Sequence, residues 1–563
     1  MRSFLRRSRI SAATCALIIA VAVLSPRAAG PPASHVPRLI VLLVVDQMRG
    51  DYVDRFEHQW TAGLHRLVTQ GAWFRQARYP YYNTITCAGH ASISTGDFPA
   101  VHGMVLNAWW DRGAHKMVNC ADDDSATSIS YGKPVKTEGE SVMHLRTTTL
   151  ADELRAQLDP AGRTIAFSLK ARSAATLGGH RPAAVAWFDD SGTWVTSSAF
   201  AKAPVVDVAN FIKRNPVERD FGKVWDRALP KDAYAYEDPA VGVRETRGMT
   251  TTFPHALKGG SASPDRGFYD QWQSSPYADE YLAHMSLDVA DRLKLGKGAS
   301  TDMLAIGFST LDKVGHDFGP NSHEIQDILI RLDRTLGELL TGLDRLVGAG
   351  NYTLALSADH GVAPIPERLQ SQGIDAGRVS AAALVRRVEE TLSNAFGPGH
   401  YVDQFLYTDL YLAPGVYEKL RDQPSALRSV RDAIRSLPGI QDVYTRDELV
   451  ANRFDDDPMG RRFAHSYYPG RSGDLLVMVR PYWMVQAVGT THGTGYDYDT
   501  LVPVILMGKG IVGGEYLTTS SPIDIAPTLA FLAGVTLPRP PGRVLAEALA
   551  APDKAIASHQ NHW

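Results

Sequence analysis

Three short apolar runs in this chain each lead directly to an acidic residue. The runs and their acidic residues are Leu39 to Val45 before Asp46, Met303 to Phe308 before Asp312, and Tyr352 to Leu356 before Asp359. Continuous apolar runs of this length are typical of parallel strands that are buried on both faces. Ligands of open α/β sheets bind at the carboxyl edge of the strands. The pattern therefore predicts three carboxylates gathered at one edge of a sheet.

Helical spacing is clearest from His323 to Leu346, where Ile and Leu recur every three or four residues. Strand-like runs alternate with helical patterns in three stretches that we expect to form one discontinuous α/β core: 36–175, 300–365 and 490–545. We expect two intervening blocks to be insertions over the catalytic edge: 176–299, and the cap-like 366–489. Residues 551–563 form a polar tail.

The amino terminus has the pattern of a signal peptide over residues 1–29. Four arginines precede an apolar run from Ala12 to Leu24, and small residues follow near Ala29. That run is shorter than the roughly 18 residues that a membrane span needs. We therefore expect cleavage near Ala29, export to the periplasm or medium, and no membrane span in the mature chain.

Removal of residues 1–29 would take away five arginines and no acidic residue, which makes the formal net charge more negative than the −3 of the full chain. A mildly acidic surface argues against nucleic acid as a stable partner, because such binding needs clustered Lys and Arg. Two cysteines, Cys87 and Cys120, would remain. They are too few for a disulfide scaffold, and they could form one bridge or be small buried apolar residues.

Residues that can bind hard or borderline divalent metals recur where strands are expected to end. They are Asp46, Thr86, Asp312, His316, Asp359, His360 and His492. Asp312 and His316 are four residues apart, Asp359 and His360 are adjacent, and His492 precedes a glycine that would let the imidazole approach an ion. Each pattern alone is more often a turn or a solvated helix face. Their combination predicts a site for two metals.

Thr86 is the expected nucleophile. A threonine hydroxyl attacks poorly unless a metal or a base stabilises its alkoxide. The following residues, Ala88 to Ser94, have the pattern of a helix, whose amino terminus would favour a phosphate. The simpler alternative is that Thr84 or Thr86 only caps this helix. Cys87 is a rival nucleophile, but no cationic residues lie near it in sequence to lower its pKa.

The chain resembles the alkaline phosphatase superfamily. The resemblance rests on Asp46, the stretch 86–96 (TCAGHASISTG), His102-Gly103, Asn107, the DxxxH of Asp312 and His316, Asp359-His360 and Thr491-His492-Gly493. Within the superfamily the chain is most similar to PafA-type phosphate-irrepressible alkaline phosphatases, which are related to nucleotide pyrophosphatase/phosphodiesterases. That similarity covers almost the whole mature chain.

The resemblance implies an alkaline-phosphatase-like three-layer sandwich, with a mostly parallel sheet and helices on both faces. It also implies two zinc ions. One would be held by Asp312, His316 and His492; the other would be held by Asp46, Asp359 and His360, and would touch Thr86. The family's threonine nucleophile corresponds to Thr86, its phosphate-binding asparagine to Asn107, and its Lys-x-Arg pair to Lys170 and Arg172.

Lys170 and Arg172 bear on the class of substrate. If the chain is extended here, residues two apart point to the same face, and both cations can reach one anion. Two cations favour a phosphate monoester dianion over a diester. The alternative is an ordinary exposed basic pair. The backbone N–H after Thr86 is expected to join Asn107 and these cations in holding the nonbridging oxygens.

These expectations describe an exported, monomeric hydrolase of small phosphate monoesters that acts through a phosphothreonine intermediate. A phosphodiesterase or nucleotide pyrophosphatase with the same metals is the main alternative. A sulfatase is disfavoured because the residues after Cys87 lack the required Pro and Arg. A binding protein with structural metals is the non-enzymatic alternative. His90 and His102 are expected to be supporting residues. The scheme requires the Thr86 oxygen to lie within about 8 Å of Asp46 or Asp359.

Overall fold

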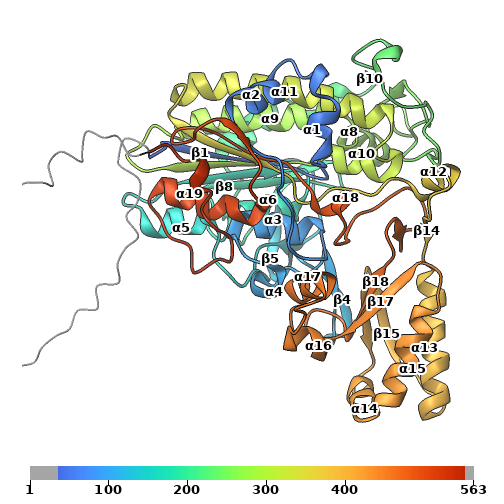
Figure 1. The fold of residues 1–563 in the computed structure, drawn as a ribbon. Coiled ribbons are helices and arrows are strands. Elements are labelled where there is room, and N and C mark those ends of the chain that lie inside the picture. Colours follow the sequence, from blue (N-terminus) through green and yellow to red (C-terminus); the bar gives the residue numbers. More distant parts are fainter. Residues whose placement is uncertain (1–35, 552–563) are drawn as a thin grey trace, which may run out of the picture.

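The computed structural model describes residues 36–551 (Figure 1). The expected signal peptide at 1–29, and the expected tail apart from its first residue, lie outside this range. Across the described residues, no helix combines the length and the apolar content that a bilayer span requires.

A mixed sheet of 11 strands forms the middle layer, in the order β21-β2-β20-β13-β1-β12-β7-β8-β9-β5-β6. The five central strands, from β13 to β8, are parallel to their neighbours, whereas β20 and β9 are antiparallel to the strands beside them. The bounds are β1 Leu39–Val45, β2 Ala72–Phe74, β5 Asp122–Ser130, β6 Glu138–Glu140, β7 Thr164–Ser168, β8 Ala184–Asp189, β9 Thr193–Ser197, β12 Asp302–Phe308, β13 Tyr352–Ser357, β20 Val504–Gly508 and β21 Gly514–Tyr516.

The sequence of β1 shows why this sheet is covered on both sides. Its alternate residues from Leu39 to Val45 face one apolar core, and the intervening ones from Ile40 to Val44 face a second core. All seven side chains are buried. An uninterrupted apolar run is therefore the pattern that a central strand of a sandwich needs, and the expected α/β three-layer fold is confirmed.

Helices cover both faces of the sheet (Figure 1). One face packs against α1 Asp51–Arg55, α2 Gly63–Gln70, α9 Pro276–Arg292, α10 Thr310–Phe318 and α11 His323–Val347. The opposite face packs against α3 Thr86–Thr95, α5 Leu150–Gln157, α6 Ala171–Gly178 and α19 Ile525–Ala533. Helix α11 spans the predicted segment, and its apolar stripe, including Leu329, Leu336 and Leu340, is buried as core packing.

The stretch 176–299 differs from the expected insertion. It supplies β8 and β9 to the central sheet, and it supplies α9, which packs against α11 and β12. Its other α-helices and strands are α7 Val206–Arg214, β10 Val224–Trp225, β11 His255–Ala256 and α8 Arg266–Gln273. Frequent Gly, Pro and Ser turns separate these short elements, which obscures the strand pattern in the sequence. The core therefore extends beyond residue 175.

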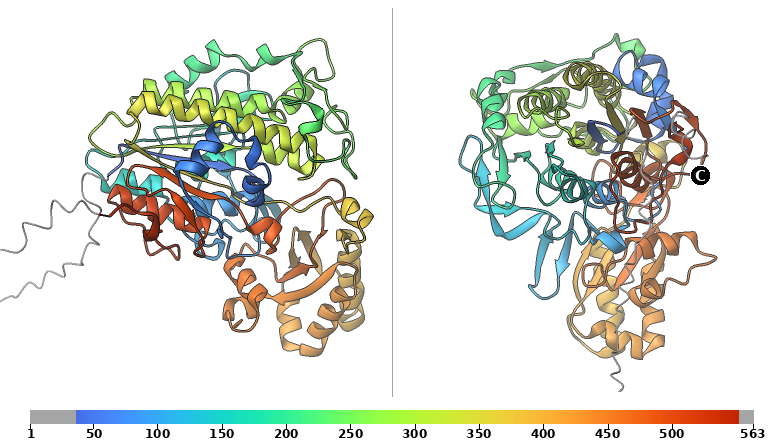
Figure 2. Two further views of the ribbon diagram at one scale, coloured as in Figure 1. Left: turned by 45° about the horizontal axis from the view of Figure 1, so that its top comes forward. Right: turned by 90° about the vertical axis from the view of Figure 1, so that its left-hand side faces the viewer.

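Residues 366–489 contain a second, smaller layered unit, drawn in orange (Figures 1 and 2). Its sheet has the order β15-β16-β18-β17, and α13 and α15 pack beside it around a separate apolar core. The bounds are α12 Pro366–Ser371, β14 Gly377–Arg378, α13 Ala381–Phe396, β15 Val402–Leu406, β16 Asp409–Leu412, α14 Val416–Asp422, α15 Pro424–Arg435, β17 Ile440–Thr445, α16 Arg446–Ala451, α17 Pro458–Ser466, β18 Leu475–Val479 and β19 Trp483–Met484.

The hairpin between β15 and β16 connects this unit to the core. Thr408 is at the turn, and its Oγ1 lies 3.2 Å from Asn83 Oδ1. Leu406 and Tyr407 pack against an apolar cluster that includes Cys87 of α3. The smaller unit therefore reaches the segment that carries Thr86.

Candidate active site

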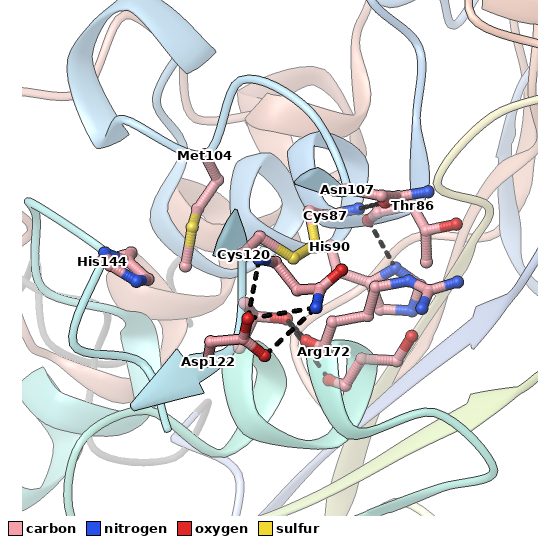
Figure 3. Close-up of a disulfide and its surroundings, with 12 residues drawn as sticks. Thr86, Cys87, His90, Met104, Asn107, Cys120, Asp122, His144 and Arg172 are labelled. Carbon is pink, nitrogen blue, oxygen red and sulfur yellow. Dashed lines mark hydrogen bonds between the residues drawn. A yellow bond between two sulfur atoms is a disulfide. The ribbon is translucent and has the colours of Figure 1, made fainter. Parts of the chain in front are cut away.

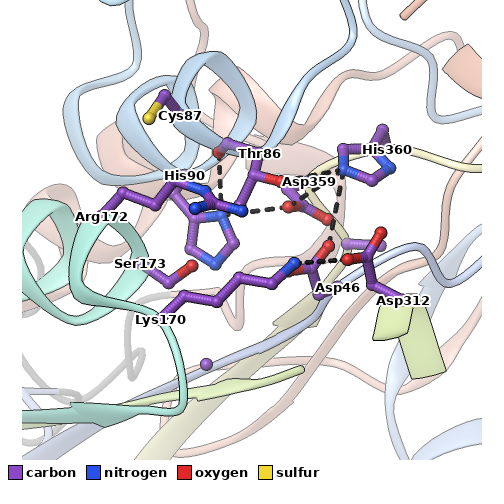
Figure 4. Close-up of polar contacts among 12 residues, drawn as sticks. Asp46, Thr86, Cys87, His90, Lys170, Arg172, Ser173, Asp312, Asp359 and His360 are labelled. Carbon is purple, nitrogen blue, oxygen red and sulfur yellow. Dashed lines mark hydrogen bonds and ion pairs between the residues drawn. The ribbon is translucent and has the colours of Figure 1, made fainter. Parts of the chain in front are cut away.

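The carboxyl edge of the parallel strands brings together the predicted acidic residues. The neighbouring strands β13, β1, β12 and β7 lead respectively to Asp359, Asp46, Asp312 and Lys170. All four side chains are buried, with at most 8 % of their surface exposed. Segments that are hundreds of residues apart in sequence thus supply one cluster because their strands are adjacent in the sheet (Figure 4).

Imidazole nitrogens lie against these carboxylates at short distances. His360 Nε2 is 3.5 Å from Asp46 Oδ1 and 3.4 Å from Asp359 Oδ2. His316 Nε2 is 3.2 Å and His492 Nε2 is 3.7 Å from Asp312 Oδ1. The six expected protein ligands other than Thr86 therefore converge.

The other nitrogen of each histidine fixes its tautomer. Nδ1 of His316 donates to the carbonyl oxygen of Thr490 over 2.8 Å, Nδ1 of His360 to that of Gly361 over 2.9 Å, and Nδ1 of His492 to that of Thr84 over 2.9 Å. A neutral imidazole whose Nδ1 carries the proton has its lone pair on Nε2. In their neutral forms, which metal ligation requires, the three histidines direct lone pairs at carboxylate oxygens, an arrangement that favours cations between them.

The electrostatics of the cluster also fit bound cations. Asp46 Oδ1 is buried without a hydrogen-bond partner. Burial, with repulsion from Asp312 and Asp359, raises the pKa of Asp46 well above its usual range. Burial and the two neighbouring histidines hold the pKa of His492 well below its usual range, which keeps its imidazole neutral as a metal ligand requires. The donor set of carboxylates and imidazoles suits zinc or a similar divalent ion.

The structure contains two candidate groups of metal ligands, and within each group the donor atoms lie within 4.8 Å of one another. One is Asp312, His316 and His492, and the other is Asp46, Asp312 and His360. Asp312 belongs to both groups. Asp359 is not part of the second group. Its Oδ2 nevertheless lies beside His360 Nε2, so Asp359 is adjacent to the ligands with which the sequence analysis grouped it.

Thr86 is the first residue of α3 and is almost fully buried. Its Oγ1 lies 3.4 Å from His360 Nε2, the nitrogen that contacts Asp46 and Asp359, so the hydroxyl lies within the 8 Å that the scheme allows. The residue that precedes α3 is Ile85, and no side-chain hydroxyl caps this helix. Thr84 instead donates to the carbonyl oxygen of Thr494 over 2.8 Å. The capping alternative for both threonines therefore does not apply.

Asn107 lies directly before β3 Ala108–Asp111 and takes over the capping of α3. The backbone N–H of Cys87 donates to Asn107 Oδ1 over 3.0 Å (Figure 3). Asn107 thus accepts from the N–H that was expected to hold a substrate oxygen, and that role of the N–H stays a prediction. Because Oδ1 accepts this bond, the NH₂ group of the Asn107 side chain is left to donate to a ligand in the neighbouring cavity, which Asn107 lines. Cys87 forms a disulfide with Cys120, which removes it as a rival nucleophile.

Lys170 and Arg172 stand at the junction of β7 and α6. Lys170 has an extended backbone, whereas Arg172 lies in the first turn of α6. The expectation that both are on extended chain is wrong, because the helix begins at Ala171. Lys170 Nζ pairs with the carboxylates of Asp46 and Asp312. Arg172 Nε is buried without a hydrogen-bond partner, and the Arg172 guanidinium lies near Thr86 (Figure 4). Arg172 is therefore a candidate cation for an anion beside Thr86.

Comparison with known proteins agrees with this geometry. The family model for type I phosphodiesterase / nucleotide pyrophosphatase matches residues 40–497. The chain belongs to this family. It is 30% identical over 520 residues to alkaline phosphatase PafA of Elizabethkingia meningoseptica, and this match covers 89% of this chain and 92% of that protein. It is also 30% identical over 529 residues to alkaline phosphatase PhoK of a Sphingomonas species, covering 89% of each chain.

A solved structure shows the same fold. The crystal structure of wild-type alkaline phosphatase PafA has a TM-score of 0.84 and 28% identity to this chain, and the match covers 92% of this chain and 100% of that structure. The recognition of a PafA-type alkaline phosphatase fold from the sequence motifs is thereby confirmed.

Within this PafA-type fold, Gln47 is a site residue that the sequence analysis missed. Its Nε2 donates to Asp312 Oδ1 over 2.7 Å, and its backbone N–H donates to Asp359 Oδ1 over 3.1 Å. It adopts a φ of 70°, which is uncommon for a residue other than glycine. Its side chain also explains a glycine in the DxxxH motif, because a Cβ at Gly315 would meet Gln47 Oε1 at 1.8 Å. Only its position directly after Asp46 marked it in the sequence.

The two supporting histidines differ in their contacts. His90 Nδ1 is 3.0 Å from the carbonyl oxygen of Thr86 and 3.1 Å from Asp359 Oδ2, so His90 holds the nucleophile segment against a candidate ligand. His102 accepts a hydrogen bond from the N–H of Met104 at Nδ1 and donates to Ser92 Oγ from Nε2. Burial lowers the pKa of His102 to about 3, so it is a neutral structural residue.

Two cavities flank the site. One, of about 430 Å³, is lined by Asn107, Lys170 and Arg172, together with Lys313. The other, of about 390 Å³, reaches His492 from the smaller unit, and its lining is mostly apolar. Tyr407, at the β15–β16 turn, lines both cavities. The smaller unit therefore contributes to the walls around the candidate site.

Proposed function

We propose that the protein is an exported alkaline phosphatase that hydrolyses small phosphate monoesters through a phosphothreonine at Thr86. The observation that carries the proposal is the position of the Thr86 hydroxyl, 3.4 Å from His360 Nε2 within a buried cluster of carboxylates and imidazoles. Arg172 supports it, because a guanidinium near this hydroxyl, with its Nε lacking a hydrogen-bond partner, suits the oxygens of a phosphoryl group. Membership of a phosphoester-hydrolysing family agrees with this chemistry.

Two zinc ions are proposed as the cofactors. Asp312, His316 and His492 would hold one ion; Asp46, Asp359 and His360 would hold the other, with Thr86 beside it. When bound, the ions would supply positive charge to the attacking oxygen, to the leaving oxygen and to the water of the second step. Metal analysis of the purified protein is expected to give two zinc ions per chain.

Substrate binding in this scheme uses residues that line the 430 Å³ cavity. Arg172 would donate to two nonbridging oxygens of the phosphoryl group, and the NH₂ of Asn107 would donate to one of them. Lys170 would contribute charge while it holds Asp46 and Asp312 in place. These contacts would stabilise the transition state to the extent that they strengthen as negative charge develops on the phosphoryl oxygens, because equal binding of substrate and transition state leaves the barrier unchanged.

The reaction proceeds in two displacements. The Thr86 hydroxyl gives up its proton to solvent, and its oxygen forms a bond to phosphorus as the bond from phosphorus to the alcohol oxygen breaks. The leaving alcohol oxygen takes up a proton from solvent. Water then attacks the phosphothreonine, which releases phosphate and returns the hydroxyl to Thr86. His90 keeps Thr86 at the start of α3 through its bond to the Thr86 carbonyl oxygen.

The variant Thr86→Ala tests the proposal. It is expected to lower kcat/KM for an aryl phosphate monoester by at least about a thousandfold, because no covalent intermediate can form. Its thermal unfolding midpoint is expected to stay near that of the wild type. Unchanged phosphate release from this variant would instead support a binding protein with structural metals.

The alternative of a phosphodiesterase or nucleotide pyrophosphatase shares Thr86 and the metals, and the family model carries that name. Initial rates distinguish a monoesterase from a diesterase. They are measured on a monoester and on a diester for the wild type, Arg172→Ala and Lys170→Ala. A monoesterase is expected to lose more monoester than diester activity in Arg172→Ala, because a dianion loses more from a missing cation. Retained monoester activity in both variants would point to the diesterase.

A further inference from the structure

A disulfide connects the nucleophile helix to the end of a hairpin. Cys87 is the second residue of α3, and Cys120 directly follows β4 Lys116–Asn119, which pairs with β3. The two Cα atoms are 6.6 Å apart, and the bridge closes a sequence separation of 33 residues. Both cysteines are buried. The bridge thus joins the neighbour of Thr86 to the far end of the hairpin that begins after Asn107.

Asn107 is held by the backbone of both bridged cysteines. The N–H of Cys87 donates to Asn107 Oδ1 over 3.0 Å, and the N–H of Cys120 donates to the Asn107 carbonyl oxygen over 2.9 Å (Figure 3). The first bond fixes the side chain and the second fixes the backbone. Asn107 is only partly buried, so packing does not fully enclose it and these two bonds help to position it.

We propose that the Cys87–Cys120 disulfide is a positioning device for Asn107. By holding α3 and the hairpin end at a constant separation, the bridge keeps both hydrogen bonds in register and the Asn107 NH₂ directed into the cavity beside Thr86. The inference rests on the proposed function, because it uses Asn107 as a contact to the phosphoryl group. A displacement of about 1 Å in such a contact can cost a hundredfold in rate.

The hairpin has a second anchor that the bridge does not provide. Trp109, in β3, is 3 % exposed, and the guanidinium of Arg471 lies 4.9 Å from its ring centroid. Loss of the bridge is therefore expected to leave the hairpin attached and to loosen its ends, where Asn107 and Cys120 lie. This separates a positioning role from a requirement for folding.

The paired variant Cys87→Ser, Cys120→Ser tests the proposal. Serine keeps both backbone N–H donors and has nearly the volume of cysteine. It also places two hydroxyl groups in the apolar cluster around these positions, so the unfolding midpoint is measured together with kcat/KM. We expect kcat/KM for a small monoester to fall on the order of tenfold, which is less than the loss of a whole oxyanion donor. In an Asn107→Ala background, the same pair is expected to change kcat/KM by less than about twofold, because the positioned group is already absent.

The same serine pair is also measured in an Arg172→Ala background, which is the matched control for the Asn107→Ala background. Arg172 has no direct link to the bridge, so the serine pair is expected to keep its full tenfold effect there. Leu332→Ala, in the core of α11, is the control for lowered stability. It should reduce the unfolding midpoint, whereas its effect on kcat/KM should be the same with and without Asn107. If the serine pair folds poorly, Cys120→Ser alone is measured in the same backgrounds.

Mass spectrometry of a non-reduced digest is expected to detect the Cys87–Cys120 linked peptide, and its absence overturns the proposal. Wild-type kcat/KM in the serine pair, or an equal loss with and without Asn107, also overturns it. If Asn107→Ala has no effect, the proposal fails together with the substrate role of Asn107. Failure of the proposed function itself is read separately, from activity that persists in Thr86→Ala.

Discussion

Individual side chains at this site acquire their chemistry from residues that are distant in sequence. Thr86 and His360 are 274 positions apart, yet their Oγ1 and Nε2 atoms are 3.4 Å apart. The tautomers of the three histidines are set by backbone carbonyls of Thr84, Gly361 and Thr490. Residue type makes these groups capable of binding a metal, and their neighbours make them ready to do so.

Asp409, at the start of β16, is a buried acid whose ionisation should affect stability. Burial raises its pKa to about 6 from 3.8, against hydrogen bonds from Gly473 N–H and Thr408 Oγ1. Because the folded pKa is above the unfolded value, the stabilisation from protonated Asp409 is complete below about pH 4. It is lost as the pH rises through about 6.

The variant Asp409→Asn removes this titration. The decrease in unfolding free energy between pH 4 and pH 8 is expected to be smaller in the variant than in the wild type, by on the order of 2 kcal/mol. Urea unfolding at several pH values measures the difference. An identical pH dependence in the two proteins would show that folding does not raise the pKa of Asp409.

At the level of helices and strands, close packing of α3 against the segment after β13 sets the distance between nucleophile and ligands. A Cβ at Gly89 would meet the Asp359 carbonyl oxygen at 2.2 Å and the Asp359 Cα at 2.6 Å. The glycine in the TCAGH stretch therefore allows the helix that begins at Thr86 to lie directly on the backbone of a candidate ligand.

Gly89→Ala is expected to push α3 away from Asp359. We expect a loss of about 1 to 3 kcal/mol in unfolding free energy from overpacking, together with a fall in kcat that exceeds any change in KM. Gly298→Ala is the matched control, because no atom lies within 4 Å of the added Cβ and its backbone is not in the left-handed region. Equal behaviour of the two variants would contradict the packing argument.

Across the whole molecule, the candidate ligands tie together β13, β1, β12 and the loop that returns from the smaller unit to His492. Burial of three carboxylates in one cluster is unfavourable without enough positive charge. Lys170 pairs with two of them, Asp46 and Asp312. Bound cations should therefore stabilise the assembled core as well as serve catalysis.

Removal of metal by a chelator is expected to abolish monoester hydrolysis and to lower the thermal unfolding midpoint by several degrees. Added zinc should restore both. In Asp312→Asn, the midpoint should respond much less to the chelator, because this residue belongs to both candidate ligand groups. Differential scanning fluorimetry with parallel activity assays tests this, and an unchanged wild-type midpoint would contradict a stabilising role for the metal.

Much of the core could be predicted because its signals are local. The apolar run of β1, the stripe of α11 and the acidic residues after β1, β12 and β13 depend on burial that each segment shows in its own pattern. The strands β8 and β9 were missed, since their short runs lie among turns and their place in the sheet depends on pairing with β7 and β5. Residue type and spacing identified the candidate ligands, whereas the role of Gln47 had no comparable signal.

The amino-acid order alone was sufficient for the fold class, the acidic strand ends and the choice of Thr86 as the candidate nucleophile, because these follow from hydrophobic period and intrinsic chemistry. Three-dimensional packing decided which groups became partners. It placed Lys170 between Asp46 and Asp312, assigned the Cys87 N–H to Asn107, and brought Cys120 to Cys87. Such pairings depend on long-range contacts, which the local pattern of a chain does not specify.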